Sequence, residues 1–276
     1  MSAPAVSVLL TSAQETSTTV LLAEAAARRG MEIETLTGPQ VAERLAGRAV
    51  YWYGGPIAAE RVAARLDLGL LEPPDDWLAG LPEEFVGRRI DLATLSEARS
   101  ITRPVFVKPP SEKSFPAAVY ADGTRLPTYG DSLGPDTPVL VSQVVTFAVE
   151  YRLFVLDGQI AAGGRYARYG RLDVASLDAD RHEQAVRDFA NRVLADCVET
   201  LPSAVTVDVG LIQDPDTGRE TWAVVEANMP WFAHCYAADP DRVLDVVLRS
   251  AGPRALVAQR DVGFVRCPSV GAAARR

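Results

Sequence analysis

The sequence predicts an α/β protein whose two halves are built differently. Up to about residue 100, short apolar runs alternate with amphipathic segments, which is typical of strands joined by helices in a parallel sheet. Beyond that point the pattern becomes strand-rich, with hairpin signals at Asp157-Gly158 and at 214–218. The 276 residues suffice for one large domain or two smaller ones, each with its own core.

In the first half, a Thr/Ser-rich stretch precedes the first helical segment and Gly30 follows it, which indicates a capped helix with a defined end. Residues 72–76, Glu-Pro-Pro-Asp-Asp, are expected to form a connector. The expected elements are strands at 6–10, 32–36 and 49–53, and helices at 20–29, 39–45, 58–66 and 91–99.

In the second half, strands dominate and only two helices are expected. The two hairpins account for the last four strands, and a long helix lies between them. The expected elements are strands at 104–108, 117–120, 139–145, 151–156, 159–162, 205–212 and 221–227, and helices at 180–198 and 240–248.

Composition excludes several classes of function. A formal net charge of −8 argues against a nucleic-acid-binding face, which needs clustered Lys and Arg. No apolar run approaches the roughly 20 residues of a membrane span, and no secretory signal is visible, so we expect a cytoplasmic protein. Cys197, Cys235 and Cys267 are widely spaced and form no metal-ligand pattern with His182 and His234.

Lysine is almost absent, because basic residues are nearly all arginine. The only lysines, Lys108 and Lys113, stand five residues apart in one motif. An ammonium group binds phosphate as a compact charge. In a chain that uses arginine almost everywhere else, two lysines in one motif therefore indicate a phosphate site. The alternative is that the two remaining lysines sit together by chance.

Carboxylates and an amide mark the second hairpin. A hairpin symmetric about its loop places Asp208 opposite Val225, and a shift of one residue places it opposite Glu226. Glu226 and Asn228 share one face because side chains alternate along a strand. Three oxygen ligands would then converge, which indicates Mg²⁺ completed by phosphate oxygens. The alternative is that one acid faces solvent and no ion binds.

The first hairpin carries an acid and two arginines. Glu150 and Arg152 share one face, and Arg165 lies near the end of the returning strand. Taken alone they also fit a plain salt-bridge network. Together with the lysines and the acids they suit a nucleotide triphosphate undergoing transfer. The chain has neither a GxxxxGK[ST] loop nor a GxGxxG motif after its first strand, so the glycine-loop nucleotide folds are poor candidates.

From about residue 104 to 228 the chain resembles an ATP-grasp enzyme, nearest the RimK-like branch. EYRLFVLDGQIAAGGR, residues 150–165, resembles the strand pair of that family. DVGL at 208–211 and VVEAN at 224–228 resemble its metal-binding Asp and Glu-x-Asn. VKPPSEKSFPA, residues 107–117, replaces the glycine-rich phosphate loop of the superfamily, as in a short bacterial branch marked by two lysines and an arginine.

The resemblance implies an ATP-grasp fold, with two α+β lobes around a nucleotide cleft behind an N-terminal α/β domain that serves the substrate. The implied division is residues 1–100 for the N-terminal domain, 101–262 for the ATP-grasp domain with small lobe 101–145 and large lobe 146–262, and 263–276 for a tail. It also implies roles for single residues. Lys108 and Lys113 would bind the ATP phosphates, the backbone of Gln143, Val144 and Val145 would contact adenine, and Glu150 would contact the ribose. Arg152 and Arg165 would face the phosphoryl and acyl groups, and Asp208, Glu226 and Asn228 would bind Mg²⁺.

The function implied is an ATP- and Mg²⁺-dependent carboxylate–amine ligase, which forms an amide or peptide bond through an acyl phosphate. Its partners would be small-molecule or peptide carboxylates and amines, with no nucleic acid or membrane, and the oligomeric state stays open. Met229-Pro230-Trp231 replaces small residues of the RimK-like enzymes, so acceptor recognition does not carry over. The alternative is a nucleotide-binding module or a phosphotransferase. Gly130 to Gly134 also fits the GDSL hydrolase pattern. That pattern needs a buried strand just before its serine, and Pro127 makes residues 125–129 a poor central strand.

Overall fold

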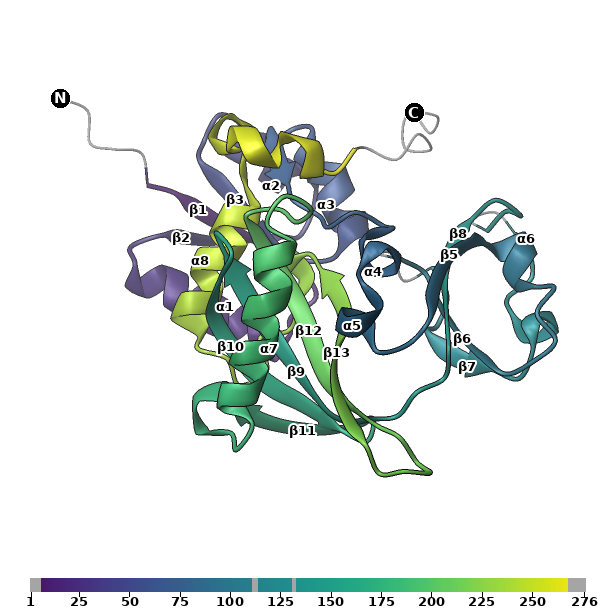
Figure 1. Ribbon diagram of the computed structural model, residues 1–276. Helices are drawn as coiled ribbons and strands as arrows, with labels where there is room; N and C mark the ends of the chain where they lie inside the picture. The colour runs from purple at the N-terminus through teal and green to yellow at the C-terminus, as the bar shows by residue number, and fades with distance from the viewer. Residues whose placement is uncertain (1–5, 111–113, 131–132, 268–276) are drawn as a thin grey trace.

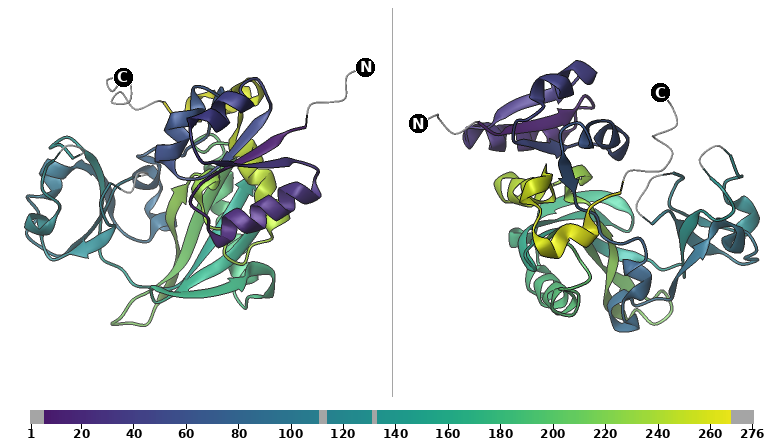
Figure 2. Two further views of the ribbon diagram at one scale, coloured as in Figure 1. Left: turned by 180° about the vertical axis from the view of Figure 1, so that it is seen from behind. Right: turned by 90° about the horizontal axis from the view of Figure 1, so that it is seen from above.

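The computed structural model describes residues 6–110, 114–130 and 133–267, which form three regions (Figure 1). A five-stranded sheet lies at the centre, a three-stranded sheet lies at the N-terminal end, and a four-stranded sheet stands to one side. Seen from above, the four-stranded sheet is set apart from the other two regions (Figure 2). No described helix combines the length and apolar character needed to cross a membrane.

The N-terminal region is the parallel α/β unit that the sequence predicts, with strand order β2-β1-β3. The Thr16 side chain caps the first helix by accepting a hydrogen bond from the Thr19 amide, and Gly30 follows the helix with a φ of 74°. The elements are β1 (Val8–Ser12), α1 (Ser17–Arg28), β2 (Glu32–Leu36), α2 (Pro39–Leu45), β3 (Val50–Tyr53) and α3 (Pro56–Ala63).

The C-terminal residues return to this region. β4 (Leu68–Leu70) pairs with β14 (Ala251–Pro253), and Leu71 bridges to Val265. Arg266 forms ion pairs with Glu60 at 2.7 Å and Glu72 at 2.6 Å. The first residues after 262, which the sequence assigns to a tail, are therefore packed against the N-terminal half. Two short helices, α4 (Trp77–Gly80) and α5 (Glu83–Val86), lead towards the four-stranded sheet.

The four-stranded sheet has the order β5-β8-β6-β7, and all its pairings are antiparallel. The prediction of a helix at 91–99 is wrong, because residues 90–94 form β5 and pair with β8. Only one helical turn, residues 95–98, follows, and the capping box of Thr94 and Glu97 begins it. This sheet therefore begins ahead of residue 101. Its elements are β5 (Ile90–Thr94), α6 (Leu95–Ala98), β6 (Val105–Lys108), β7 (Ala118–Tyr120) and β8 (Pro138–Ser142).

The central sheet is antiparallel, with the order β11-β10-β9-β12-β13. Asp157 and Gly158 have φ values of 49° and 76°, which confirms the tight turn predicted between β9 and β10. Helix α7 (Glu183–Asp196) covers one face of the sheet, and α8 (Pro240–Ser250) packs against the other face and α1 (Figure 1). The strands are β9 (Phe147–Leu156), β10 (Gln159–Arg168), β11 (Arg171–Ser176), β12 (Ala204–Gln213) and β13 (Glu220–Asn228).

Candidate functional site

The register of the central strands gathers the predicted acids. Asp208 lies opposite Glu226 on β13 and opposite Arg152 on β9, and directly opposed residues share one face of a sheet. An irregularity between Asp208 and Val209 supplies the shift of one residue that the sequence left open. The bulge therefore decides that the two acids become cross-strand neighbours.

Arg152 holds Asp208 through two parallel hydrogen bonds. Its Nε donates to Oδ1 at 2.9 Å and its Nη2 donates to Oδ2 at 2.7 Å. The Asp208 side chain is 1% exposed, so an unpaired carboxylate there would be strongly destabilising. Burial disfavours a charged guanidinium, yet Asp208 and Glu226 raise the pKa of Arg152 above its ordinary value. Arg152 stays charged and fixes the position of Asp208.

Lys108 enters the cluster from the other sheet. It ends β6, and its Nζ donates to Glu226 Oε2. Asn228 donates from Nδ2 to the second oxygen of Glu226, at 2.6 Å. Burial by itself raises the pKa of Glu226, but the Lys108 ammonium, the Arg152 guanidinium and the Asn228 amide together outweigh it and lower that pKa to about 2. One ion pair therefore joins the four-stranded sheet to the central sheet.

A cavity of about 400 Å³ lies on one side of this ion pair. Residues 143–146, which connect β8 to β9, line it together with Phe106, Glu150, Lys108 and Glu226. Gln143 is held in place because its side chain and its amide pair with the backbone of Arg89 at 2.9 and 3.1 Å. The residues predicted to contact adenine and ribose therefore line one cavity, and Lys108 lies at its boundary.

A second cavity, of about 610 Å³, lies beyond the same pair. Lys108 and Glu226 line both cavities, while Arg152 and Asn228 line only the second. The segment after Asn228 supplies much of the remaining lining. Two ligands placed in these cavities would meet beside Lys108 and Glu226.

Two tyrosines that were not predicted for the site support Arg152. The rings of Tyr166 and Tyr236 are stacked at 5.2 Å, and the Arg152 guanidinium lies 5.6 and 5.4 Å from their centroids. The Tyr166 hydroxyl donates to Glu150 Oε2 at 2.8 Å. Burial raises the pKa of Glu150, and this hydrogen bond opposes the rise. Tyr166 alternates with Arg165 along β10, and that alternation is the signal from which its face could have been predicted.

Arg88 is a further residue that the sequence did not identify. Its guanidinium donates to the carbonyls of Val86 and Val224 at 2.8 Å and of Val225 at 3.2 Å, and it lies 5.3 Å from the Phe147 ring centroid. Burial lowers its pKa to about 10. Arg88 lines the 400 Å³ cavity and fixes the β13 backbone just before Glu226. Its sequence context, an arginine pair after a glycine, carries no recognisable signal.

Arg165 does not join the cluster. It lies opposite Tyr151, whose ring belongs to the core beneath α7, so its side chain is on the other face of the central sheet. There it binds Asp180 and also Asp173, the latter at 2.9 Å. The structure therefore separates the two arginines that were predicted to act together. Lys113 lies outside the described residues.

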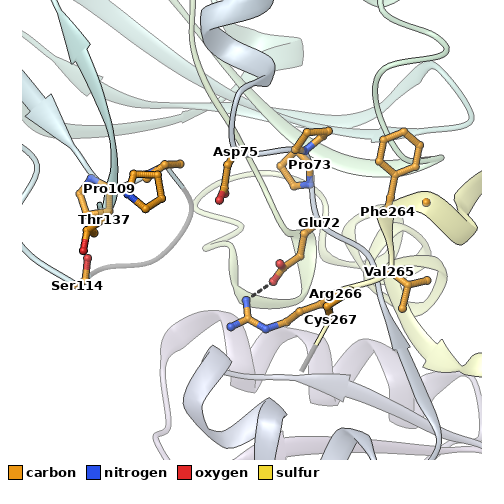
Figure 3. Close-up of a pocket in the computed structure, with 14 residues that line it drawn as sticks. Glu72, Pro73, Asp75, Pro109, Ser114, Thr137, Phe264, Val265, Arg266 and Cys267 are labelled. Atoms are coloured by element: carbon orange, nitrogen blue, oxygen red, sulfur yellow. Dashed lines mark hydrogen bonds and ion pairs between the residues drawn. The ribbon is translucent and has the colours of Figure 1, made fainter. Parts of the chain in front are cut away.

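A third cavity, of about 410 Å³, lies between the loop after β6 and the C-terminal segment (Figure 3). Pro109 and Ser114 line one side of it, and Asp75 and the Glu72–Arg266 ion pair line the other. None of the described residues predicted for the site lines this cavity. Of the GDSL pattern, Asp131 and Ser132 lie outside the described residues.

The donor chemistry of the cluster fits Mg²⁺. Asp208, Glu226 and Asn228 offer only oxygen ligands, on neighbouring strands of one hairpin. Within the described ranges no group of three or more His, Cys, Asp and Glu side chains is arranged to hold a metal ion, and this set offers two carboxylates and one amide oxygen.

Comparison with known proteins identifies the class. Residues 85–246, more than half of the chain, match the family described as ATP-grasp domain, R-2K clade family 2. The chain is therefore an ATP-grasp protein. Within that superfamily it belongs to family 2 of this clade, which confirms the predicted ATP-grasp fold and superfamily. No curated protein matches it.

Solved structures that resemble this one share little sequence identity with it. A RimK-domain ATP-grasp protein from Sphaerobacter thermophilus shares 18% identity over 88% of this chain and 99% of its own, with a TM-score of 0.45. D-alanine–D-alanine ligase from Bacillus anthracis shares 10% identity over 90% of this chain and 96% of its own, with a TM-score of 0.49. The macrocyclase MdnC from Microcystis aeruginosa, bound with its precursor peptide, shares 11% identity over 88% of this chain and 99% of its own, with a TM-score of 0.44.

Proposed function

We propose that this protein is an ATP-dependent ligase that joins a carboxylate to an amine through an acyl phosphate. One observation supports this most directly: Lys108 from one sheet binds Glu226 from another at the boundary between two cavities. A ligase of this kind needs a nucleotide site and an acceptor site that share the place where the phosphoryl group moves. The ATP-grasp family membership supports the same assignment.

In this proposal the nucleotide base occupies the 400 Å³ cavity. The base lies against Phe106 and the backbone of 143–145, the ribose meets Glu150, and the triphosphate extends to Lys108. The Lys108 ammonium then exchanges Glu226 for phosphate oxygens, and the released carboxylate becomes available to a cation. Lys113 would be a second phosphate ligand.

Asp208, Glu226 and Asn228 would hold Mg²⁺. The ion would supply positive charge next to the phosphate oxygens. The protein orients this set in advance, because Arg152 fixes both oxygens of Asp208 and Asn228 contacts Glu226. Arg165 would not contact the reacting groups, since its side chain pairs with Asp173 and Asp180 on the other face.

The reaction proceeds in two transfers. A carboxylate oxygen of the acid attacks the γ-phosphorus, and the bond to the leaving ADP oxygen breaks, which gives an acyl phosphate. The amine nitrogen then attacks the acyl carbon, phosphate leaves with the bonding electrons, and the nitrogen loses a proton. Lys108 and Arg152 stabilise the negative charge on the transferring group.

The direct test is ADP release measured with an acid, an amine, both or neither, with mass spectrometry of the products. The proposal predicts that ADP release depends on both substrates and that an amide forms. ADP together with only a phosphorylated product identifies a phosphotransferase. Nucleotide binding without any ADP release identifies a binding module, and either result refutes the ligase.

A further inference from the structure

The 610 Å³ cavity has a lining that changes from charged to apolar. Lys108, Arg152 and Glu226 form the charged part, next to the nucleotide cavity. Beyond Asn228 the apolar lining includes Met229, Phe232 and Tyr236, together with Phe115 from the connection between β6 and β7. A cavity with this lining suits a ligand that has an anionic group and an apolar body.

The Lys, Arg and acidic side chains that the structure describes in this cavity are paired with one another or with Asp208. Lys108 pairs with Glu226, and Arg152 binds both oxygens of Asp208. His234, which also lines the cavity, is hydrogen-bonded through Nδ1 to Thr18 at 3.4 Å. Apart from Lys108 and Arg152 the described lining holds no Lys or Arg side chain, so a second negative charge at its apolar end would have no cationic partner there, which is unfavourable. The body of the ligand is therefore expected to be neutral.

The N-terminal region holds the apolar wall in place. The Gly54 amide donates to the Trp231 carbonyl at 2.9 Å, and the Tyr53 hydroxyl donates to the Ala233 carbonyl at 3.1 Å. Met229 and Trp231 belong to the core of the N-terminal sheet, where both are nearly fully buried. A wall fixed in this way loses little conformational entropy when a ligand binds.

Tyr236 adds a strained aromatic surface to the wall. Its φ of 49° is a left-handed conformation that a bulky side chain rarely adopts. Such a conformation persists only where the surroundings impose it, and strained residues concentrate at functional sites. Here it places the ring against Tyr166 and under Arg152 while the residue still lines the cavity.

We propose that the acid activated in this cavity is monoanionic and carries an aromatic or large aliphatic group, as in an amino-acid residue or a peptide end with such a side chain. This inference rests on the proposed ligase function and specifies its substrate class. The carboxylate lies next to Lys108 and Arg152, and the apolar group packs on Met229, Phe232 and Tyr236.

The test uses hydroxylamine as the amine, so that the natural acceptor need not be known. Its nitrogen attacks the acyl phosphate, phosphate leaves, and a hydroxamate forms that can be quantified. The acids compared are N-acetyl-L-phenylalanine, N-acetyl-L-leucine, N-acetylglycine and N-acetyl-L-aspartate, each with Mg-ATP. We expect kcat/KM for the phenylalanine compound to exceed that for the glycine compound at least about tenfold, from burial of one large apolar side chain.

Two matched variants separate the cavities. Phe232→Ala is expected to lower the preference for N-acetylphenylalanine over N-acetylglycine about tenfold, mainly through KM for the acid. Phe106→Ala, in the nucleotide cavity, is expected to raise KM for Mg-ATP and to keep the preference among acids.

Equal use of the four acids, a preference for N-acetylaspartate, or an unchanged preference in Phe232→Ala overturns the inference. So does a protein that makes no hydroxamate with any of the acids while its melting temperature still rises with Mg-ATP. A melting temperature that ignores Mg-ATP instead refutes the proposed function, and the inference falls with it.

Discussion

Arg152 and Arg165 lie on paired strands, and each binds buried or partly buried carboxylates, yet their surroundings differ. Arg152 contacts acids on its own sheet at a place where Lys108 arrives from another sheet and two cavities meet. Arg165 contacts Asp173 and Asp180, which follow it along the chain, on the face covered by α7. The same kind of ion pair is therefore part of a candidate active site on one face and part of the scaffold on the other.

The largest expected effect separates the two arginines by activity. Arg152→Lys keeps a positive charge but cannot reach both oxygens of Asp208, so Asp208 and the transferring phosphate are no longer oriented. We expect substrate-dependent ADP release to fall about 1,000-fold. Arg165→Lys is expected to change the rate less than about threefold. Equal losses in the two variants, measured in the same ADP assay, would remove the distinction between the faces.

The next effect concerns stability. Arg165→Ala leaves Asp180, whose side chain is fully buried, without its guanidinium partner. We expect the free energy of unfolding in urea to fall by about 4 kcal/mol. Arg187→Ala, which removes more exposed pairs with Asp178 and Glu183, is the control and is expected to cost about 0.5 kcal/mol. A cost for Arg165→Ala no larger than the control would show that Asp180 does not depend on it.

Acid should reveal the Lys108–Glu226 pair. The pKa of Glu226 is lowered from 4.5 to about 2, so its contribution to stability is complete above pH 4.5 and is lost as the pH falls towards 2. We expect the free energy of unfolding to fall across this window. Glu226→Gln should remove that part of the pH dependence. Urea unfolding at several pH values measures it, and identical pH profiles for variant and wild type would contradict the pairing.

The smallest expected effect concerns Tyr166, which contacts Glu150 of the 400 Å³ cavity and Arg152 of the 610 Å³ cavity. Tyr166→Phe removes the hydroxyl that donates to Glu150 and keeps the ring beneath Arg152. We expect Mg-ATP to bind about fivefold more weakly, equivalent to about 1 kcal/mol. Tyr120→Phe, whose hydroxyl donates to the Pro116 carbonyl, is the control and should bind as wild type does. Calorimetric titration distinguishes the two, and unchanged affinity in Tyr166→Phe would exclude Glu150 from the nucleotide site.

Local patterns sufficed where neighbours in sequence are neighbours in space. The N-terminal strands and helices, the turn at Asp157-Gly158 and both hairpins follow from alternation and turn residues. β5 did not follow, because its partner β8 lies more than 40 residues further along the chain and the sequence between Ile90 and Thr94 carries no local sign of that pairing. The capping box at Thr94 and Glu97 begins a helix only after Thr94, and that helix is a single turn.

The site was predictable to the extent that period-two alternation determines a face. Alternation placed Glu226 beside Asn228, but only the bulge next to Asp208 decided that the acids face each other. The irregularity between Arg165 and Ala167 had no signal in the sequence, and neither did the folding back of residues 231–236 that brings Tyr236 onto Tyr166. Such contacts depend on how the regions pack, which a local pattern does not contain.

The central claim is that Lys108 and the Asp208, Glu226 and Asn228 set bind the two sides of one nucleotide. The most direct measurement is the Mg-ATP dependence of the melting temperature in wild type, Lys108→Ala and Asp208→Asn. At about 100 times the dissociation constant, Mg-ATP should stabilise the wild type by about 2.7 kcal/mol. The Lys108→Ala variant should show no rise in melting temperature with Mg-ATP. In the Asp208→Asn variant the rise caused by ATP should not depend on Mg²⁺. A wild-type protein indifferent to millimolar Mg-ATP, or a Lys108→Ala variant that shifts as wild type does, would contradict the claim.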